Sequence, residues 1–237
     1  MRLAAVDACA GIVRSTTMPD MAPLLTTTSL PRIGDPAPDF EAPSTHGPLR
    51  LSTWRGGDWV VLFSHPADFT PVCSTEMAEF ARRAKEFEKR GVKLLGLSID
   101  SIHSHLAWRE NLKQVLKVEL PFPIIADMTM EVARLYGMLH DRVSTVATVR
   151  AVFVIDGKGV IRALVYYPMS VGRNMDEILR LVDALQTTDA HACATPVNWR
   201  PGEAVIVPPP KTVDEVAERL SRTDTERIDF YLSKKKL

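Results

Sequence analysis

The chain has 237 residues, of which 46% are hydrophobic and 24% charged, and its 29 basic and 29 acidic side chains give a formal net charge of zero. This composition is typical of a soluble protein with one sizeable hydrophobic core and a smaller appendage. Zero net charge argues against a nucleic-acid partner, which requires a basic field, and no apolar run is long enough to cross a membrane.

The N-terminal segment, residues 1–30, differs from the rest of the chain. It contains two arginines, several Ser and Thr, and only Asp7 and Asp20 as acids, a composition faintly similar to that of a transit peptide. A disordered leader, or a true start at Met18 or Met21, fits the same composition. We expect a cytoplasmic protein with a disordered leader, and organellar targeting is the alternative.

Strands and helices alternate between Ile33 and about Gln186. Short apolar runs predict strands, and apolar residues at 3.6-residue spacing predict helices. The expected strands are 59–63, 92–99, 122–126, 151–155 and 160–167, and the expected helices are 102–116, 129–136, 174–185 and the one that follows Cys73. The last two strands should form a hairpin across Asp156-Gly157-Lys158-Gly159, and Asn174 should cap the last helix. This order predicts an α/β fold with a central mixed sheet flanked by helices.

The composition changes after Thr195. Prolines interrupt a segment with one short strand at 204–207 and one helix at 213–220. Lys234-Lys235-Lys236 at its end is expected to be a solvated tail. Because this segment is too small for a core of its own, we divide the chain into a leader (1–30), a main domain (31–190) and a C-terminal arm (191–237). The arm should pack on the domain or on a neighbouring subunit.

Cysteine is scarce, with Cys9, Cys73 and Cys193 in the whole chain. This number does not make a disulfide framework and suits a reducing compartment, where a single cysteine can serve chemistry. Cys73 enters the first turn of a helix directly after a buried strand. Unpaired backbone N–H groups and the positive end of the helix dipole favour a thiolate there, and the thiolate is the nucleophilic form. A lone cysteine before a helix is more often a small buried hydrophobe.

The residues around Cys73 favour the reactive alternative and suit the reduction of a peroxide. A thiolate attacks one oxygen of the O–O bond, and the departing oxygen needs hydrogen-bond donors already in place. Thr70 offers a hydroxyl one helical turn away, and Pro66 stiffens the loop without a competing N–H. Arg150, at the entry to a predicted strand, is the candidate cation over the thiolate, although it could instead be a surface charge. His65 either belongs to the site or is a satisfied core histidine.

The sequence resembles the one-cysteine branch of the peroxiredoxins, thiol peroxidases of the thiol-specific antioxidant and alkyl hydroperoxide reductase family. The resemblance starts near Ile33 and continues into the arm. The matching segments are Phe63-Ser64-His65-Pro66-Ala67-Asp68-Phe69-Thr70-Pro71-Val72-Cys73, Leu97-Ser98-Ile99-Asp100-Ser101, Leu120-Pro121-Phe122-Pro123-Ile124-Ile125, Gly172-Arg173-Asn174 with Asp176-Glu177-Ile178-Leu179-Arg180, and Ala194-Thr195-Pro196-Val197-Asn198-Trp199.

The resemblance implies a thioredoxin-like fold in which Cys73 attacks hydrogen peroxide or an organic hydroperoxide and becomes a sulfenic acid. It assigns Thr70, Arg150, Pro66 and His65 to the pocket of Cys73. It implies a homodimer formed across the arm, and leaves open a decamer built from such dimers. No metal or organic cofactor is expected, because no His/Cys cluster has metal-ligand spacing and no glycine-rich phosphate loop occurs.

Two departures from the family pattern matter. Two-cysteine relatives carry a resolving cysteine directly before the proline of a Cys-Pro-x-x-Trp segment, where this chain has Thr195, and Cys193 lies two residues earlier. We therefore expect an external thiol, and not Cys193, to reduce the sulfenic acid. Some relatives also hydrolyse phospholipids through a serine whose position here is Asp58, so that activity is not expected.

Two other functions are compatible with the sequence. An oligomer built from the arms could hold partner proteins, with Cys73 acting as a redox switch. A thiol–disulfide oxidoreductase on the same fold is the weaker alternative, because the chain has no Cys-x-x-Cys motif.

Overall fold

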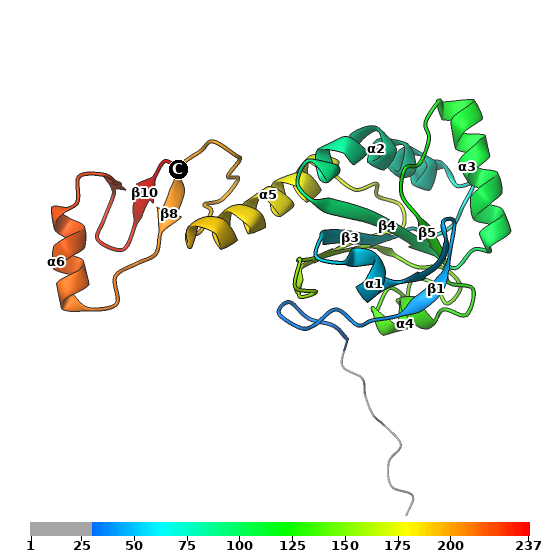
Figure 1. The fold of residues 1–237 in the computed structure, drawn as a ribbon, viewed down its shortest axis with the longest axis horizontal. Helices are drawn as coiled ribbons and strands as arrows, with labels where there is room; N and C mark the ends of the chain where they lie inside the picture. Colours follow the sequence, from blue (N-terminus) through cyan, green and yellow to red (C-terminus); the bar gives the residue numbers. More distant parts are fainter. Residues whose placement is uncertain (1–29) are drawn as a thin grey trace, which may run out of the picture.

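The computed structural model describes residues 30–237, so the expectations for the leader, and Cys9 with them, lie outside the described residues. A main domain of strands and helices is followed by a long helix that leads to the arm (Figure 1). The elements are β1 (Glu41–Ser44), β2 (Gly47–Arg50), α1 (Leu51–Arg55), β3 (Trp59–Ser64), α2 (Pro71–Glu88), β4 (Val92–Ser98), α3 (Ile102–Leu116), β5 (Ile124–Ala126), α4 (Glu131–Leu135), β6 (Arg150–Ile155), β7 (Ile161–Tyr167), α5 (Met175–His191), β8 (Val205–Val207), α6 (Val213–Ser221), β9 (Glu226–Arg227) and β10 (Ser233–Lys235).

The sheet of the main domain has seven strands in the order β2-β1-β5-β4-β3-β6-β7. β3 runs parallel to β4, and β4 to β5, whereas β3 pairs antiparallel with β6, and β6 with β7. The sheet is therefore mixed, and the predicted thioredoxin-like arrangement of a central sheet flanked by helices is confirmed. β3 lies between β4 and β6, so the loop that leaves its carboxyl end sits near the centre of the sheet.

Side chains point alternately to the two faces of the sheet along each strand, and a hydrophobic core covers each face. Val61 and Phe63 of β3 pack in one core with residues of α2, α3 and α5. Val60 and Leu62 pack in the other core with residues of α1 and α4. As a result β3 is buried except at Trp59 and β4 except at Lys93, and these strands give the site a rigid base.

Most predicted elements are present, and the differences have local causes. The hairpin of β6 and β7 is confirmed across residues 156–160, and the Asn174 side chain caps α5 by accepting from the N–H groups of Asp176 and Glu177. α4 starts two residues later than expected because Met130 has a left-handed backbone (φ 60°). α5 continues to His191, where Ala192 (φ 48°) ends it.

The arm forms a second, three-stranded sheet in the order β8-β10-β9, beside α6. α5 separates it from the main domain in Figure 1. The expected solvated tail at Lys234 is wrong, because Ser233–Lys235 form the central strand β10 and pair with both β8 and β9. Trp199 packs with Val205, Ala184 and Cys193 where the arm meets α5.

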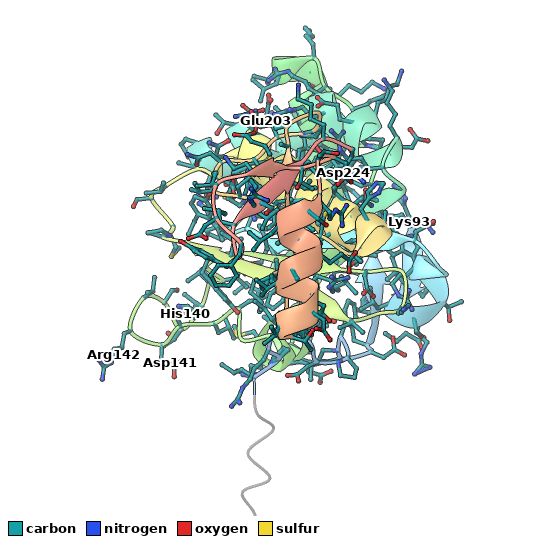
Figure 2. The ribbon with its side chains drawn as sticks, turned by 90° about the vertical axis from the view of Figure 1, so that its left-hand side faces the viewer. Lys93, His140, Asp141, Arg142, Glu203 and Asp224 are labelled. Atoms are coloured by element: carbon teal, nitrogen blue, oxygen red, sulfur yellow. The ribbon has the colours of Figure 1, made fainter. Side chains whose placement is uncertain are left out.

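Many large apolar side chains of the arm are exposed in the single chain. They are Val197, Val213, Leu220, Ile228, Phe230, Tyr231 and Leu237. Figure 2, which looks at the molecule from the arm side with α6 in front, also shows the loop of His140, Asp141 and Arg142 projecting from the main domain. Among residues 30–237, no helix has the length and apolarity that crossing a membrane requires.

Candidate active site

Cys73 lies in the first turn of α2, as the sequence predicts. Pro71 occupies the first helical position, where its missing N–H costs nothing, and it restricts the preceding Thr70 to extended backbone (φ −105°, ψ 148°). The side chain of Cys73 is fully buried. No acidic residue lies in this first turn, so no carboxylate of the turn itself offsets the positive end of the helix dipole.

Arg150 contacts the sulfur directly. It is the first residue of β6, and its Nη1 donates to Sγ of Cys73 over 3.3 Å. Its Nε and Nη2 both donate to the carbonyl of Met169, at 2.9 and 2.6 Å, which fixes the plane of the guanidinium. Only 2% of Arg150 is exposed, so the alternative of a surface charge at a strand end is wrong.

A buried carboxylate holds Arg150 against Cys73. Glu76, one helical turn after the cysteine, accepts from Nη1 of Arg150 at 2.6 Å. It also accepts from the backbone N–H, Nε and Nη2 of Arg173, at 2.8, 2.9 and 2.7 Å. Arg173 in turn donates to the carbonyls of Ser64 and Ala151. Two guanidinium groups and one carboxylate leave net positive charge beside the sulfur, which favours a thiolate.

The charge state of Glu76 follows from these contacts. Burial by itself raises the pKa of a carboxyl group. Here the charge and hydrogen bonds of Arg173, followed by the charge of Arg150, outweigh burial and hold the pKa of Glu76 below its usual value. The carboxylate is therefore ionised at neutral pH and keeps both arginines in place.

Thr70 and Pro66 shape the loop between β3 and α2. The hydroxyl of Thr70 donates to the carbonyl of Ala67 over 2.8 Å. Its hydrogen is therefore used within the loop, and the oxygen is left as an acceptor. The sequence places this hydroxyl within one helical turn of the sulfur, and in the structure its hydrogen meets the carbonyl of Ala67. Pro66 is buried directly after His65.

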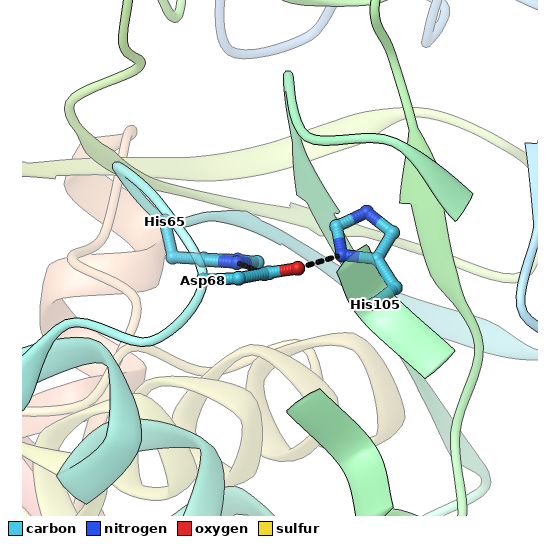
Figure 3. Close-up of side chains that lie close together, drawn as sticks. All are labelled: His65, Asp68 and His105. Atoms are coloured by element: carbon cyan, nitrogen blue, oxygen red, sulfur yellow. Dashed lines mark hydrogen bonds and ion pairs between the residues drawn. The ribbon is translucent and has the colours of Figure 1, made fainter. Parts of the chain in front are cut away.

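His65 belongs to a second buried cluster. Its Nε2 lies 2.9 Å from Oδ1 of Asp68, and the other oxygen of Asp68 lies 2.7 Å from Nδ1 of His105. Figure 3 shows these three side chains together, with His105 coming from α3. Within residues 30–237, no hydrogen bond joins His65 or Pro66 to Cys73.

These three residues are also close enough to bind a metal ion. Their possible ligand atoms all lie within 4.8 Å of one another, which no other group of such residues in the described part of the chain achieves. Their spacings, however, are those of hydrogen bonds, and the remaining nitrogen of His105 lies 3.1 Å from the carbonyl of Ile125. A metal would have to displace protons that already join these groups. Protons alone account for the arrangement.

Sequence reasoning did not identify Glu76, Arg173, Asp68 or His105 as functional. The signal at Glu76 was a charged residue on the apolar face of a helix, one turn from the cysteine. His105 gave a similar signal on α3, three residues before the buried Trp108. Charged or titratable side chains on the apolar face of a helix are seldom buried without a hydrogen-bond or ion-pair partner.

The comparisons with known proteins agree with this geometry. Residues 33–164 match the AhpC/TSA family, and residues 184–222 match the C-terminal domain of 1-Cys peroxiredoxin. A peroxiredoxin of Aquifex aeolicus is 53% identical over 219 residues, covering 88% of this chain and 98% of that protein.

Two solved structures are also similar. The yeast mitochondrial 1-Cys peroxiredoxin has a TM-score of 0.79 and 44% identity, and the match covers 87% of this chain and 99% of that one. The peroxiredoxin 6 of Arenicola marina has a TM-score of 0.79 and 38% identity, over 86% and 97% of the two chains. With its thioredoxin-like fold and its arginine-bound helix-terminal cysteine, the chain belongs to the peroxiredoxins of the AhpC/TSA family and is a thiol-dependent peroxidase.

Proposed function

We propose that this peroxiredoxin reduces hydrogen peroxide and small organic hydroperoxides through Cys73, and that an external thiol completes the cycle. The observation that carries the proposal is the 3.3 Å contact between Nη1 of Arg150 and Sγ of Cys73. A guanidinium at this distance stabilises the thiolate, and its positive charge also stabilises the charge that develops on the departing oxygen of a peroxide.

The chemistry balances without a cofactor. The thiolate attacks one oxygen of the O–O bond, and the sulfur is oxidised to a sulfenic acid. The other oxygen takes a proton and leaves as water or an alcohol. One external thiol then forms a mixed disulfide and releases water, and a second thiol regenerates Cys73.

The burial of Cys73 supports a preference for small oxidants. Cys73 is fully buried, so a bulky hydroperoxide has less access to the sulfur than a small one. Rate constants for hydrogen peroxide, tert-butyl hydroperoxide and a long-chain lipid hydroperoxide test this preference. We expect the long-chain compound to react slowest, and equal rates for all three would contradict it.

The position of Cys193 supports an external reductant. Arg173 lies two residues before α5 and donates to Glu76 beside Cys73, so the start of α5 is near the site. Cys193 lies beyond the other end of this 17-residue helix. A helix of this length spans about 25 Å, so the two cysteines of one chain are far apart. The solved yeast relative is described as resolved through glutathione and thioredoxin systems, which is reduction by outside thiols.

Intact-mass spectrometry and non-reducing gels after a short pulse of peroxide test this mechanism. We expect a sulfenic acid on Cys73, with a mixed disulfide once glutathione is added, and the same products from Cys193→Ser. A Cys73–Cys193 disulfide formed in stoichiometric yield, within one chain or between two, would contradict the external-thiol mechanism. Absence of any oxidation on Cys73 would contradict the proposed function itself.

A homodimer formed through the arm is part of the proposal. Val197 and Val213 expose 88% and 85% of their surface, and Phe230 and Tyr231, further along the arm, are exposed as well. Exposed apolar residues gathered in one appendage are typical of an association surface. Light scattering of the whole protein tests the dimer and also shows whether dimers assemble further into a decamer.

We also propose a cytoplasmic location. Its support is the small number of cysteines, which suits a reducing compartment. Fractionation of cells that express the full chain, followed by detection of its C-terminal end, tests this location. Recovery in an organellar fraction, with a shortened N-terminus, would instead support targeting by the leader.

A further inference from the structure

The C-terminal arm contains a cavity that the chemistry of Cys73 does not use. This space, the arm cavity, has a volume of about 350 Å³, which lies within the usual range of small-molecule sites. One wall comes from the segment that connects β8 to α6, and the other comes from α6 itself (Figure 1). The lining includes the three prolines 208–210 and the charged residues Lys211, Glu215, Glu218, Arg219 and Arg222.

The two walls differ in character. Three consecutive prolines have no backbone N–H groups and form a stiff apolar surface. The charged residues recur every three or four positions from Lys211 to Arg222, so they lie on one face of α6 and at its two ends. A cavity with one apolar wall and one charged wall suits a ligand that has an apolar body and an ionised head.

Arg219 is the buried member of the charged wall, with 8% of its surface exposed. Its Nη2 donates to the carbonyl of Pro208 over 2.8 Å. Its Nη1 is buried and has no hydrogen-bond partner among residues 30–237, and its guanidinium makes no ion pair within that range. A buried charged donor without an acceptor is costly, so an acceptor that enters the cavity is stabilised there.

The carboxylates of the lining are engaged elsewhere. Glu215 accepts from a backbone N–H at the start of α6. Arg222 donates twice to Asp224, at 2.8 and 2.6 Å. The hydrogen bond and charge of Asp224, followed by the charge of Glu218, raise the pKa of Arg222. Arg219 is therefore the cation of this wall that is both buried and without a carboxylate beside it.

We propose that the arm cavity binds a small carboxylic acid with an apolar body, whose carboxylate accepts from Nη1 of Arg219 while its carbon chain packs against the prolines. Hydrogen bonds between a guanidinium and a carboxylate are among the strong ones in proteins. The two glutamates of the lining oppose a second negative charge, and a phosphate carries about −1.5 to −2 at pH 7, so a carboxylate is favoured. This function of the arm is separate from the peroxidase reaction at Cys73.

Titration of the whole protein with sodium hexanoate, followed by calorimetry and by backbone NMR, tests the proposal. We expect saturable binding, with signal changes centred on residues 207–222. Hexan-1-ol has the same carbon chain without the charge, and inorganic phosphate has charge without the chain. Each should bind at least about tenfold more weakly. Absence of saturable hexanoate binding, or equal binding of either control compound, would overturn the proposal.

Substitutions at two arginines of the same cavity test the assigned residue. Arg219→Gln keeps a donor for the carbonyl of Pro208 but removes the charge, so the affinity for hexanoate should fall by about tenfold or more. Arg222→Gln is the matched control, because Asp224 already pairs this cation, and we expect less than about a twofold change. Equal losses in the two variants would overturn the proposal.

The wild-type protein decides the outcome if Arg219→Gln does not fold. The Nε–H signal of Arg219 in nitrogen-15 NMR, assigned by its loss in Arg219→Lys, should shift as hexanoate is added. An unmoved signal at saturation would overturn the proposal. Backbone signals of α6 in each free variant show whether the helix is intact.

A carboxylate side chain of a second copy offers the same chemistry, and light scattering distinguishes this source from a free acid. A free acid that occupies an open cavity leaves the oligomeric state unchanged, which is the result we expect. Release of monomers at saturating hexanoate would overturn the free acid as the ligand, because the added acid would then be displacing a carboxylate of the second copy.

Discussion

Val61 and Phe63 of the main domain are fully buried, whereas Val197 and Val213 of the arm leave 88% and 85% of their surface exposed. The main domain covers both faces of its sheet with helices, and it encloses a network of charged groups around Cys73. The arm has a small sheet beside one helix, and its ion pairs lie at the surface. The comparison teaches that the chemistry depends on burial within one chain, whereas the arm leaves many of its apolar side chains exposed in the single chain, as the proposed dimer requires.

Cys73→Ser should separate the properties of the two regions most clearly, because it should change the reaction and leave the oligomeric state unchanged. A serine hydroxyl is not ionised at neutral pH and is a far weaker nucleophile than a thiolate, so peroxide consumption should be abolished. The oligomeric state should not change, because the arm is untouched. Stopped-flow peroxide assays and light scattering measure the two properties on the same sample. Residual turnover above that of free thiol would assign the reaction to another residue.

Glu76→Gln should give the largest loss of stability. The substitution leaves Arg150 and Arg173 buried without their shared carboxylate, and breaking a buried charge pair costs about 3–5 kcal/mol. Urea unfolding at neutral pH measures the loss. Asp224→Asn is the matched control in the arm, where the carboxylate pairs with Arg222 at the surface (Figure 2), and we expect no measurable change there. Equal effects at both sites would contradict the comparison.

The stability of the wild-type protein should also depend on pH through Glu76. Because the folded-state pKa of Glu76 is lowered, its contribution is fully present above its usual pKa of 4.5 and is lost as the pH falls through the folded-state value. Unfolding curves measured between neutral and acid pH should therefore converge for the wild type and Glu76→Gln. Curves that stay parallel to the lowest pH would show that Glu76 does not titrate in this way.

Arg150→Ala should slow the reaction strongly while leaving the arm intact. Removing one preorganised donor from a transition state typically costs about 10²–10³ in rate, and here the same group also stabilises the thiolate. We expect kcat/KM to fall by that factor, and alkylation of Cys73 to require a higher pH. Arg150→Lys keeps the charge but lacks the fork of donors that binds the carbonyl of Met169. Its kcat/KM should therefore lie between the values of the wild type and Arg150→Ala. An unshifted alkylation profile would exclude Arg150 from stabilising the thiolate.

Substitution in the arm should give the reverse pattern, with association lost and chemistry kept. Truncating a well-packed aromatic at an interface typically costs about 2 kcal/mol, or roughly a thirtyfold weaker dimer. Phe230→Ala is the test, and Val115→Ala, an exposed apolar residue of α3, is the matched control. Sedimentation equilibrium measures the dimer constant. An unchanged constant for Phe230→Ala would exclude this residue from the interface.

The elements that could be predicted from the sequence are those that a local pattern of residues determines. The range of α3 follows from its 3.6-residue apolar period, and the β6–β7 hairpin from a glycine-rich turn. Cys73 could be placed because a strand, a loop and a helix terminus follow each other in the chain, and Arg150 because it stands at the entry to an apolar strand. β10 was missed because its lysines have the polarity of a tail, and only pairing with β8 and β9 makes it a strand.

The buried partners could not be predicted for a related reason. Arg173 is 97 residues from Glu76 along the chain, and His105 is 37 residues from Asp68. Their meaning depends on tertiary proximity, which no local period encodes. The spacing of Thr70 and Cys73 places the hydroxyl near the sulfur but does not say which acceptor its hydrogen meets, and in the structure that acceptor is the carbonyl of Ala67.

Thr70→Val should have the smallest effect among these substitutions, and it tests how the loop supports the cysteine. The hydroxyl donates to Ala67, and a hydrogen bond of this kind contributes about 1 kcal/mol. Valine has nearly the same shape but no hydroxyl, so we expect kcat/KM to fall by about fivefold, which corresponds to about 1 kcal/mol. Thr70→Ser keeps the donor and should restore most of the rate. A full rate in Thr70→Val would mean that Pro66 and Pro71 hold the loop in place without the threonine hydroxyl.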